Sequence, residues 1–212
     1  MAYYLELDGV DDYVAFPRIS LSGDFKVLVD FVSSGTDAQR LLGEFGSFSN
    51  YISINAPLSE GVEVKVGSTI IGTFSTPRIN NGLRHSLEVV RVGGDVTVFY
   101  DGTQLGSGTE TRTFNIDRLG NYGSTSTFFL GDTYYFKVTS AGSVIHEYDF
   151  NDGAGTTLTD IVGTKDGTLT NFPTDDSQWV FYTPPATGPV TPINLSVTNI
   201  LTTSARLNWE QG

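Results

Sequence analysis

The sequence has no cysteine, so the fold cannot depend on disulfide bonds, and the redox compartment stays open. Its two histidines nearly exclude a histidine-based zinc site or a catalytic triad. Basic residues are also scarce, because 12 lysines and arginines stand against 24 acidic residues, a net charge of −12. Binders of nucleic acid or of acidic membranes need a basic surface, so we expect neither partner.

Long apolar runs are missing as well, since no stretch approaches the roughly 18 apolar residues of a membrane span. Residues typical of a strand follow Met1 directly, without a basic and apolar leader, so we expect no export signal in this chain. Glycine is abundant, with 24 residues, and together with Ser and Thr it separates short apolar runs, which favours strands over helices. A length of 212 residues suits one all-β sandwich with little left over.

The stretch from Tyr3 to Pro17 predicts two short strands around an acidic turn. Leu5 and Leu7 alternate with polar neighbours, and the turn begins at Asp8. This stretch, YYLELDGVDDYVAFP, resembles the "FDGxDDYV" signature of laminin-G-like, concanavalin A-like jelly-roll modules. The resemblance implies an all-β fold, a two-sheet antiparallel jelly-roll sandwich, and a binding or structural role.

Further strands are predicted along the chain. The long and mostly apolar run at 25–32 is typical of a strand buried on both faces, whereas VEVKV at 62–66 alternates between apolar and charged residues. Other strands are expected at 40–45, 51–55, 70–74, 128–138, 143–149 and 178–182. Alternation also places five aromatic residues in the core: Phe25, Phe31, Phe99, Phe129 and Phe136.

Three further segments resemble the same family. Residues 83–106 contain two turns, Gly93-Gly94 and Asp101-Gly102, and resemble its "HHVAVTRDGGTVTLYVDG" hairpin, with His85 as a partly buried edge residue. Residues 128–138 resemble "YFxGxIxxVKV", and residues 150–172 resemble "FNEGSGTTVTDSSGNGNDGTLTN". In most relatives the last segment precedes the acidic turn, so the order here is similar to a circular permutation. In this permuted order the chain resembles modules of bacteriophage tail and virion-surface proteins.

The composition changes after residue 182, which predicts three parts. Residues 1–182 form the laminin-G-like jelly roll, and residues 183–191, rich in proline, form a semi-rigid linker. Residues 192–212 resemble the first two strands of a fibronectin type III domain. A domain of that type needs about 100 residues, so these strands belong to a truncated domain or dock on a neighbour.

Acidic residues suggest a metal site. Asp8, Asp11 and Asp12 place three carboxylates at one bend, and Ca²⁺ prefers such oxygen ligands. The family resemblance implies structural Ca²⁺ at this edge, with further oxygens from the last strand or from the 149–166 segment. The oxygen-bearing residues of that segment are Asp149, Asn151, Asp152, Asp160 and Asp166. The alternative is that these residues are turn formers and caps.

Enzymatic activity is not expected. Glu147, Asp149 and Asp152 fall one methylene short of the "ExDxxE" pattern of concanavalin A-like glycoside hydrolases, and no aromatic-rich cleft strand flanks them. A glycan-contact loop is a better candidate, because exposed aromatic rings stack on sugar faces. The predicted contact residues are Tyr122 with Asn121 and Arg118, in and beside the loop GNYGSTST.

We therefore expect a non-catalytic binding module on a virion surface or outside the cell, which recognises bacterial surface carbohydrate. A structural module that mediates assembly with other virion or adhesin subunits is the alternative, and a glycoside hydrolase is the second alternative. The expected partners are such subunits and a cell-surface glycan. Homo-oligomerisation stays open.

Overall fold

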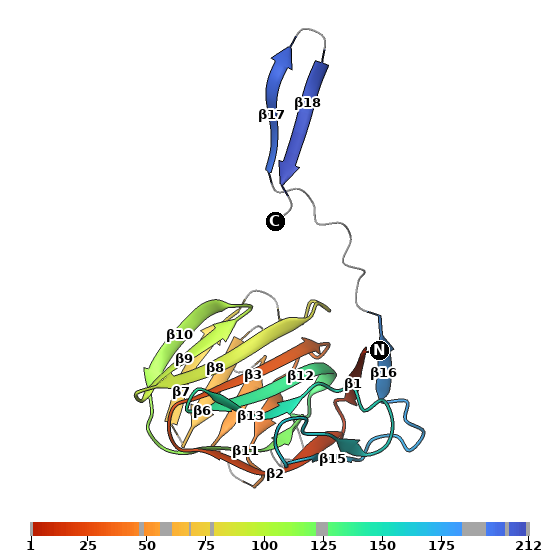
Figure 1. Cartoon of the computed structure of the whole chain (residues 1–212). Coiled ribbons are helices and arrows are strands. Elements are labelled where there is room, and N and C mark those ends of the chain that lie inside the picture. Colours follow the sequence, from red (N-terminus) through yellow and green to blue (C-terminus); the bar gives the residue numbers. More distant parts are fainter. Residues whose placement is uncertain are drawn as a thin grey trace. The chain divides into compact units, whose positions relative to one another are not determined.

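The computed structural model describes residues 2–46, 49–55, 61–67, 69–76, 79–121, 127–183, 194–201 and 204–210, the last two ranges as backbone alone. The chain divides into two compact units, Met1–Tyr182 and Thr183–Gly212. The described residues of the first unit form strands and connecting loops (Figure 1). In the described part of the chain, no helix has the length and apolar character needed to cross a membrane.

Sheet A runs in the order β10-β9-β8-β3-β12-β1-β16, and β13 also pairs with β12. All its pairings are antiparallel. Its strands are β10 (Thr103–Thr109), β9 (Asp95–Tyr100), β8 (His85–Val92), β3 (Phe25–Ser33), β12 (Leu130–Ser140), β1 (Ala2–Asp8), β16 (Trp179–Tyr182) and β13 (Ser143–Tyr148).

Sheet B runs in the order β14-β15-β2-β11-β4-β5-β6-β7, again with antiparallel pairings. Its strands are β14 (Thr157–Leu158), β15 (Gly167–Thr170), β2 (Tyr13–Leu21), β11 (Phe114–Leu119), β4 (Gln39–Gly43), β5 (Tyr51–Ile54), β6 (Gly61–Val66) and β7 (Thr69–Ser75).

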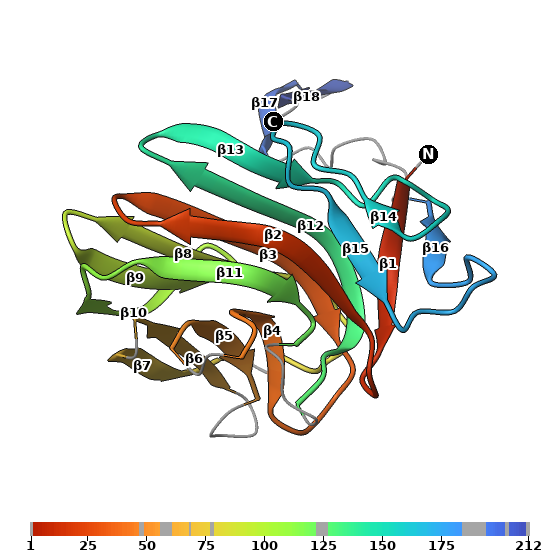
Figure 2. The same cartoon turned by 90° about the horizontal axis from the view of Figure 1, so that it is seen from below.

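The two sheets stack face to face, as Figure 2 shows where β2 and β11 lie over β3 and β12. The core between them is aromatic. Phe136 of sheet A stacks on Tyr148 with 5.2 Å between ring centroids, and Phe16 of sheet B packs on both rings. Alternating residues of each strand fill this layer, which is the packing expected of a sandwich. The predicted two-sheet antiparallel jelly roll is therefore confirmed.

Two details of the sequence prediction are wrong. Up to Phe31, β3 is buried on one face only: Phe25, Val27, Val29 and Phe31 are buried, but Lys26, Leu28 and Asp30 between them are half-buried, because the outer face of sheet A meets solvent. Phe99 is not in the core either. Its neighbours in β9, Val98 and Tyr100, are buried, so alternation turns Phe99 to the outer face.

The acidic turn connects the two layers. β1 belongs to sheet A and β2 to sheet B, so residues 9–12 carry the chain across one edge of the sandwich. β16, the last strand of the unit, pairs with β1 so that Tyr182 lies opposite Ala2. The sandwich therefore begins and ends on neighbouring strands.

The second unit contains one antiparallel pair, β17 (Asn194–Leu201) and β18 (Ser204–Glu210). The resemblance of this segment to a fibronectin type III domain stays a prediction.

Candidate functional site

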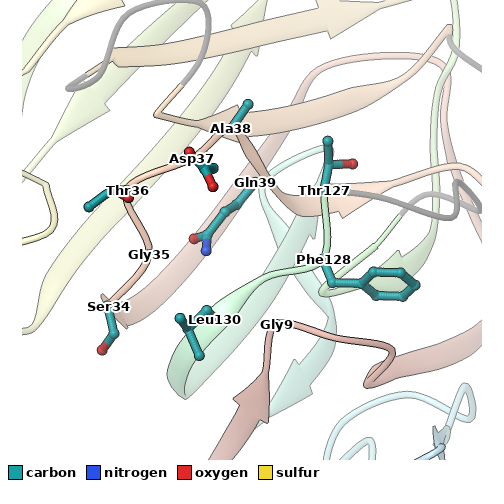
Figure 3. A pocket seen from close by; sticks show the side chains of 10 residues that line it. All are labelled: Gly9, Ser34, Gly35, Thr36, Asp37, Ala38, Gln39, Thr127, Phe128 and Leu130. Carbon is teal, nitrogen blue, oxygen red and sulfur yellow. The ribbon is translucent and has the colours of Figure 1, made fainter.

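A cavity of about 300 Å³ opens at the rim of the sandwich, beside the acidic turn (Figure 3). We call it the rim cavity. It is built from three segments that are distant in the sequence: the turn after β1, the loop between β3 and β4, and residues 127–130, which lead into β12. Its lining residues are Gly9, Ser34, Gly35, Thr36, Asp37, Ala38, Gln39, Thr127, Phe128 and Leu130.

Backbone hydrogen bonds hold the rim cavity in shape. The amide of Ser34 donates to the carbonyl of Leu130 at 3.0 Å, and the amide of Arg40 donates to the carbonyl of Thr127 at 2.9 Å. Gln39 is 4% exposed, and its Oε1 accepts a hydrogen bond from the hydroxyl of Ser33 at 3.3 Å. A Cβ atom at Gly35 would lie 1.8 Å from Nε2 of Gln39, so glycine is required for this side chain to lie against the loop.

The lining of the rim cavity combines hydroxyl groups, a carboxylate and an amide with the apolar side chains of Phe128 and Leu130. Such a mixture suits a small polyhydroxylated ligand, because the polar groups orient its hydroxyls and the apolar groups cover its C–H faces. The sequence prediction missed these residues. The only signal was the polar segment SSGTDAQ at 33–39 between two strands, which by itself is typical of any loop.

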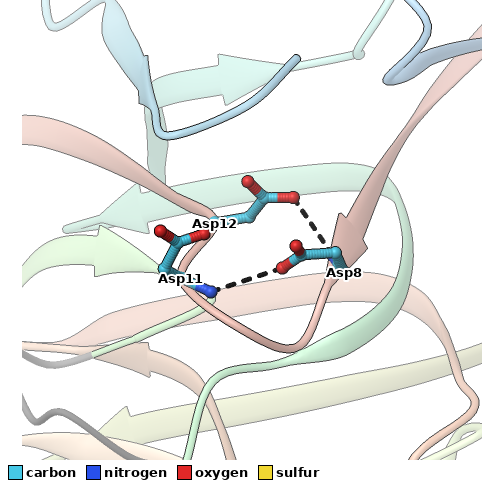
Figure 4. A group of neighbouring side chains, drawn as sticks. All are labelled: Asp8, Asp11 and Asp12. Carbon is cyan, nitrogen blue, oxygen red and sulfur yellow. Dashed lines mark hydrogen bonds between the residues drawn. The ribbon is translucent and has the colours of Figure 1, made fainter.

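The acidic turn brings Asp8, Asp11 and Asp12 together, with ligand atoms within 4.8 Å of one another (Figure 4). Their carboxylates also support the turn. Oδ1 of Asp8 accepts from the amides of Val10 at 2.8 Å and Asp11 at 3.3 Å, and Oδ2 of Asp12 accepts from the amide of Asp8 at 3.1 Å. Asp12 is buried, and this burial, with a smaller effect of the neighbouring carboxylates, raises the pKa of Asp12 to about 6.

A second, smaller cavity of about 110 Å³ adjoins this turn and is lined by Glu6, Asp8, Asp12, Pro173, Ser177 and Gln178. We call it the acidic cavity. Gln178 is 3% exposed, and its Oε1 has no hydrogen-bond partner among the described residues. Carboxylate and amide oxygens are the ligands that Ca²⁺ prefers, so the donors at this turn fit the ion that the family resemblance implies.

The other predicted metal ligands lie elsewhere. Oδ1 of Asn151 accepts from the amide of Tyr3 at 3.1 Å, and Tyr3 precedes Asp8 by five strand residues, roughly 16 Å. Asp149 accepts from Asn151, and Asp152 accepts from the amide of Thr159 at 3.1 Å. Ligands of one Ca²⁺ ion lie within about 5 Å of one another. The structure thus brings together the first three predicted ligands and not the other three. Asp149 and Asp152 accept hydrogen bonds within their own segment, and Asn151 accepts one from β1.

Two other predicted metal ligands, Asp160 and Asp166, accept hydrogen bonds from nearby groups of the chain. Asp160 accepts from Nδ1 of His146 at 2.6 Å and from the amide of Gly163 at 2.8 Å. Asp166 accepts from the amide of Asp160 at 2.9 Å. These carboxylates shape the loop between β13 and β15.

The three predicted glycan-contact residues have different surroundings. Tyr122 lies outside the described residues. Asn121 is 3% exposed. Arg118 lies with its guanidinium 4.6 Å from the ring of Phe45 and 5.3 Å from that of Tyr13, and it donates to the carbonyl of Asp117. The structure therefore holds Arg118 against the aromatic rings of Tyr13 in β2 and of Phe45 after β4. Thr127 and Phe128, further along the chain, line the rim cavity.

The carboxylates considered for glycoside hydrolysis have structural partners. Glu147 accepts a hydrogen bond from the hydroxyl of Tyr135, and Asp149 and Asp152 support the loop that follows β13. None of these three residues lines the rim cavity or the acidic cavity.

Comparison with solved structures places the fold. A protein from Bacteroides ovatus that is assigned to carbohydrate binding matches with a TM-score of 0.63 and 13% identity, over 79% of this chain and 57% of its own length. The LG1-3 region of the laminin alpha2 chain matches with a TM-score of 0.54 and 17% identity, over 70% of this chain and 30% of its own. The chain thus spans little more than half of the first protein and under a third of the second. No protein-family model and no curated protein matches the sequence.

These likenesses define the class of fold: the first unit is a jelly-roll sandwich similar to laminin G modules. At such low identity they carry the fold alone.

Proposed function

We propose that this protein is a non-catalytic carbohydrate-binding module whose ligand enters the rim cavity. The observation that carries the proposal is the lining of that cavity, in which residues with hydroxyl, carboxylate and amide groups stand beside Phe128 and Leu130. A volume of about 300 Å³ is at the lower end of the range for small-molecule sites and suits one or two sugar units. The structural likeness to a protein assigned to carbohydrate binding supports this class of ligand.

We further propose that the module acts outside the cell, on the surface of a virion, and recognises bacterial surface carbohydrate there. This context rests on the sequence resemblance to bacteriophage tail and virion-surface modules. The net charge of −12 is consistent with an uncharged or cationic ligand and opposes nucleic acid.

A glycan array with the full chain, followed by calorimetric titration of the glycans that bind, tests the proposal. Asp37 and Ser34 line the rim cavity, and Asp37 is exposed, so Asp37→Ala and Ser34→Ala are expected to leave the fold intact. We expect each variant to weaken binding about tenfold, the effect of one lost hydrogen bond to a ligand.

Asp95→Ala is the matched control, because Asp95 is an exposed carboxylate in the β8–β9 hairpin, outside the rim cavity. Equal affinity of the Asp37→Ala variant and the wild type would contradict the assignment of the cavity. An array on which no glycan binds, together with concentration-dependent self-association, would favour the alternative of an assembly module.

A further inference from the structure

The outer face of sheet A carries a group of three tyrosines. Leu5 and Leu7 are fully buried, so Tyr4 and Glu6 beside them point away from the core. The ring of Tyr4 packs on that of Tyr134 in β12 with 4.9 Å between centroids, and Tyr134 meets Tyr182 of β16 edge-on at 5.8 Å. All three rings are half-buried. We call them the tyrosine cluster.

Two carboxylates lie beside the tyrosine cluster without a counter-charge. Glu6 of β1 and Asp132 of β12 are directly opposite each other in the ladder, a position in which like charges destabilise a sheet. Within the described residues Glu6 has no ion pair, and Asp132 accepts only from the hydroxyl of Tyr134 at 3.4 Å. Burial, and next the charge of Glu6, raises the pKa of Asp132 to about 6.

The one cation described at this cluster belongs to another carboxylate. Arg84 pairs with Asp30 at 2.6 Å, and its guanidinium lies 4.6 Å from the centre of the Tyr134 ring. The Tyr134 ring thus already carries the cation of Arg84, an arrangement that the ring's negative face favours. This arrangement leaves Glu6 and Asp132 uncompensated.

The acidic cavity adjoins the same carboxylate pair, because Glu6 belongs to both. Its polar lining includes the carboxylates of Glu6, Asp8 and Asp12, which accept hydrogen bonds when ionised. Gln178 adds an acceptor, since its Nε2 donates to the carbonyl of Gly155 at 3.3 Å and its buried Oε1 has no partner in the described part of the chain. Oδ1 of Asp8 and Oδ2 of Asp12 already accept backbone hydrogen bonds, so the acceptors left without a partner among the described residues are the carboxylate of Glu6 and Oε1 of Gln178. These acceptors call for a ligand rich in donors and positively charged.

We propose that this face binds a sugar that carries a free amino group, with the ammonium between Glu6, Asp132 and the acidic cavity and an apolar ring face on the tyrosine cluster. A neutral sugar would leave the carboxylate pair uncompensated, and a metal ion alone would make no use of the rings. The inference rests on the proposed function for the class of ligand, and it assigns a different site.

Calorimetric titration of the full chain with a β-1,4-linked tetramer of glucosamine, in the presence of EDTA, tests this site. The fully N-acetylated tetramer has the same rings without the charge, and we expect it to bind at least tenfold more weakly. Glu6→Gln and Asp132→Asn should each weaken binding of the amino form about tenfold, as the loss of one charge-assisted hydrogen bond.

Glu63→Gln is the control for unspecific attraction, because it removes one negative charge from β6 in sheet B. Equal binding of the two tetramers, or equal weakening by Glu63→Gln and Glu6→Gln, would overturn the site. Asp37→Ala separates the two proposals. If it abolishes binding of the amino tetramer while Glu6→Gln does not, the sugar occupies the rim cavity and this inference fails, but the proposed function stands.

Discussion

Asp11 and Asp12 are neighbours in the acidic turn, yet their carboxylates have different tasks. Asp12 is 3% exposed and accepts a hydrogen bond from the amide of Asp8, so its removal would disturb the turn. Asp11 is exposed, and its carboxylate has no hydrogen bond within the described residues. Asp11 is therefore the residue that separates metal binding from support of the turn.

We predict that Ca²⁺ raises the melting temperature of the wild type and that Asp11→Asn removes most of this rise. A site at a ligand concentration 100 times its dissociation constant contributes about 2.7 kcal/mol to the free energy of unfolding. Asp95→Asn, which changes an exposed acid in the β8–β9 hairpin, should keep the full rise. Melting curves of the wild type that coincide in Ca²⁺ and in chelator would remove the metal from the proposal.

Among the elements, β12 has an unusual position, because it pairs with β3 along one edge and with two strands along the other. Residues 130–133 pair with β1, and residues 136–140 pair with β13. Gly131 lies at the start of this ladder with φ +146°, and a Cβ atom there would come within 2.0 Å of the carbonyl oxygen of Val32. That contact is with backbone, so no side-chain rotation relieves it.

Gly131→Ala should therefore lower the free energy of unfolding by about 2–4 kcal/mol, measured by urea denaturation. Gly142 is the matched control. It also has a positive φ, +81°, in the β12–β13 turn, but a Cβ atom there meets no atom within 4 Å, so Gly142→Ala should cost only about 1 kcal/mol. Similar losses in both variants would show that the φ angle alone decides, without the clash.

The elements could be predicted from the sequence to different degrees. Alternation in VEVKV and the Gly93-Gly94 turn predict β6 and the β8–β9 hairpin, because these signals are local. The strand order could not be predicted, since β12 pairs with β1 across more than 100 residues and no local pattern encodes such a pairing. Phe99 shows the limit of alternation, because the period identifies one face but not which face is buried.

The same limit applies to the candidate sites. Asp8, Asp11 and Asp12 could be grouped because one short turn holds them. The rim cavity could not be predicted, because its three segments look like ordinary polar loops in the sequence and only the fold brings them together. The tyrosine cluster likewise depends on the register of β1 against β12 and β16.

For the whole molecule, two groups of carboxylates make the free energy of unfolding depend on pH in opposite directions. The pKa values of Asp12 and Asp132 are raised to about 6, so their contribution is fully present below their ordinary pKa, near 3.8, and is lost as the pH rises through 6. Hydrogen bonds from Arg112 lower the pKa of Glu110 to about 2, and hydrogen bonds from His146 and backbone amides, against the effect of burial, lower that of Asp160 to about 2. Their contribution is present above the ordinary pKa and is lost as the pH falls toward 2.

We therefore predict that the free energy of unfolding rises when the pH is lowered from about 7.5 to about 5 and falls again below about 4. Urea denaturation at a series of pH values measures this profile. Asp132→Asn should reduce the rise by an amount on the order of 1 kcal/mol, because it removes a carboxyl group whose pKa is higher in the folded state than in the unfolded state. A stability that falls steadily from neutral pH downward would contradict the assignment.

The pairing of Ala2 with Tyr182 has a mechanical consequence for a module carried in a longer polypeptide. Tension applied at these two residues pulls an antiparallel pair apart from its open end, so the ladder bonds between β1 and β16 break one after another instead of sharing the load. Peeling of β16 would then uncover the edge of β1 next to Tyr4, and stretching of the chain would act first on the tyrosine cluster.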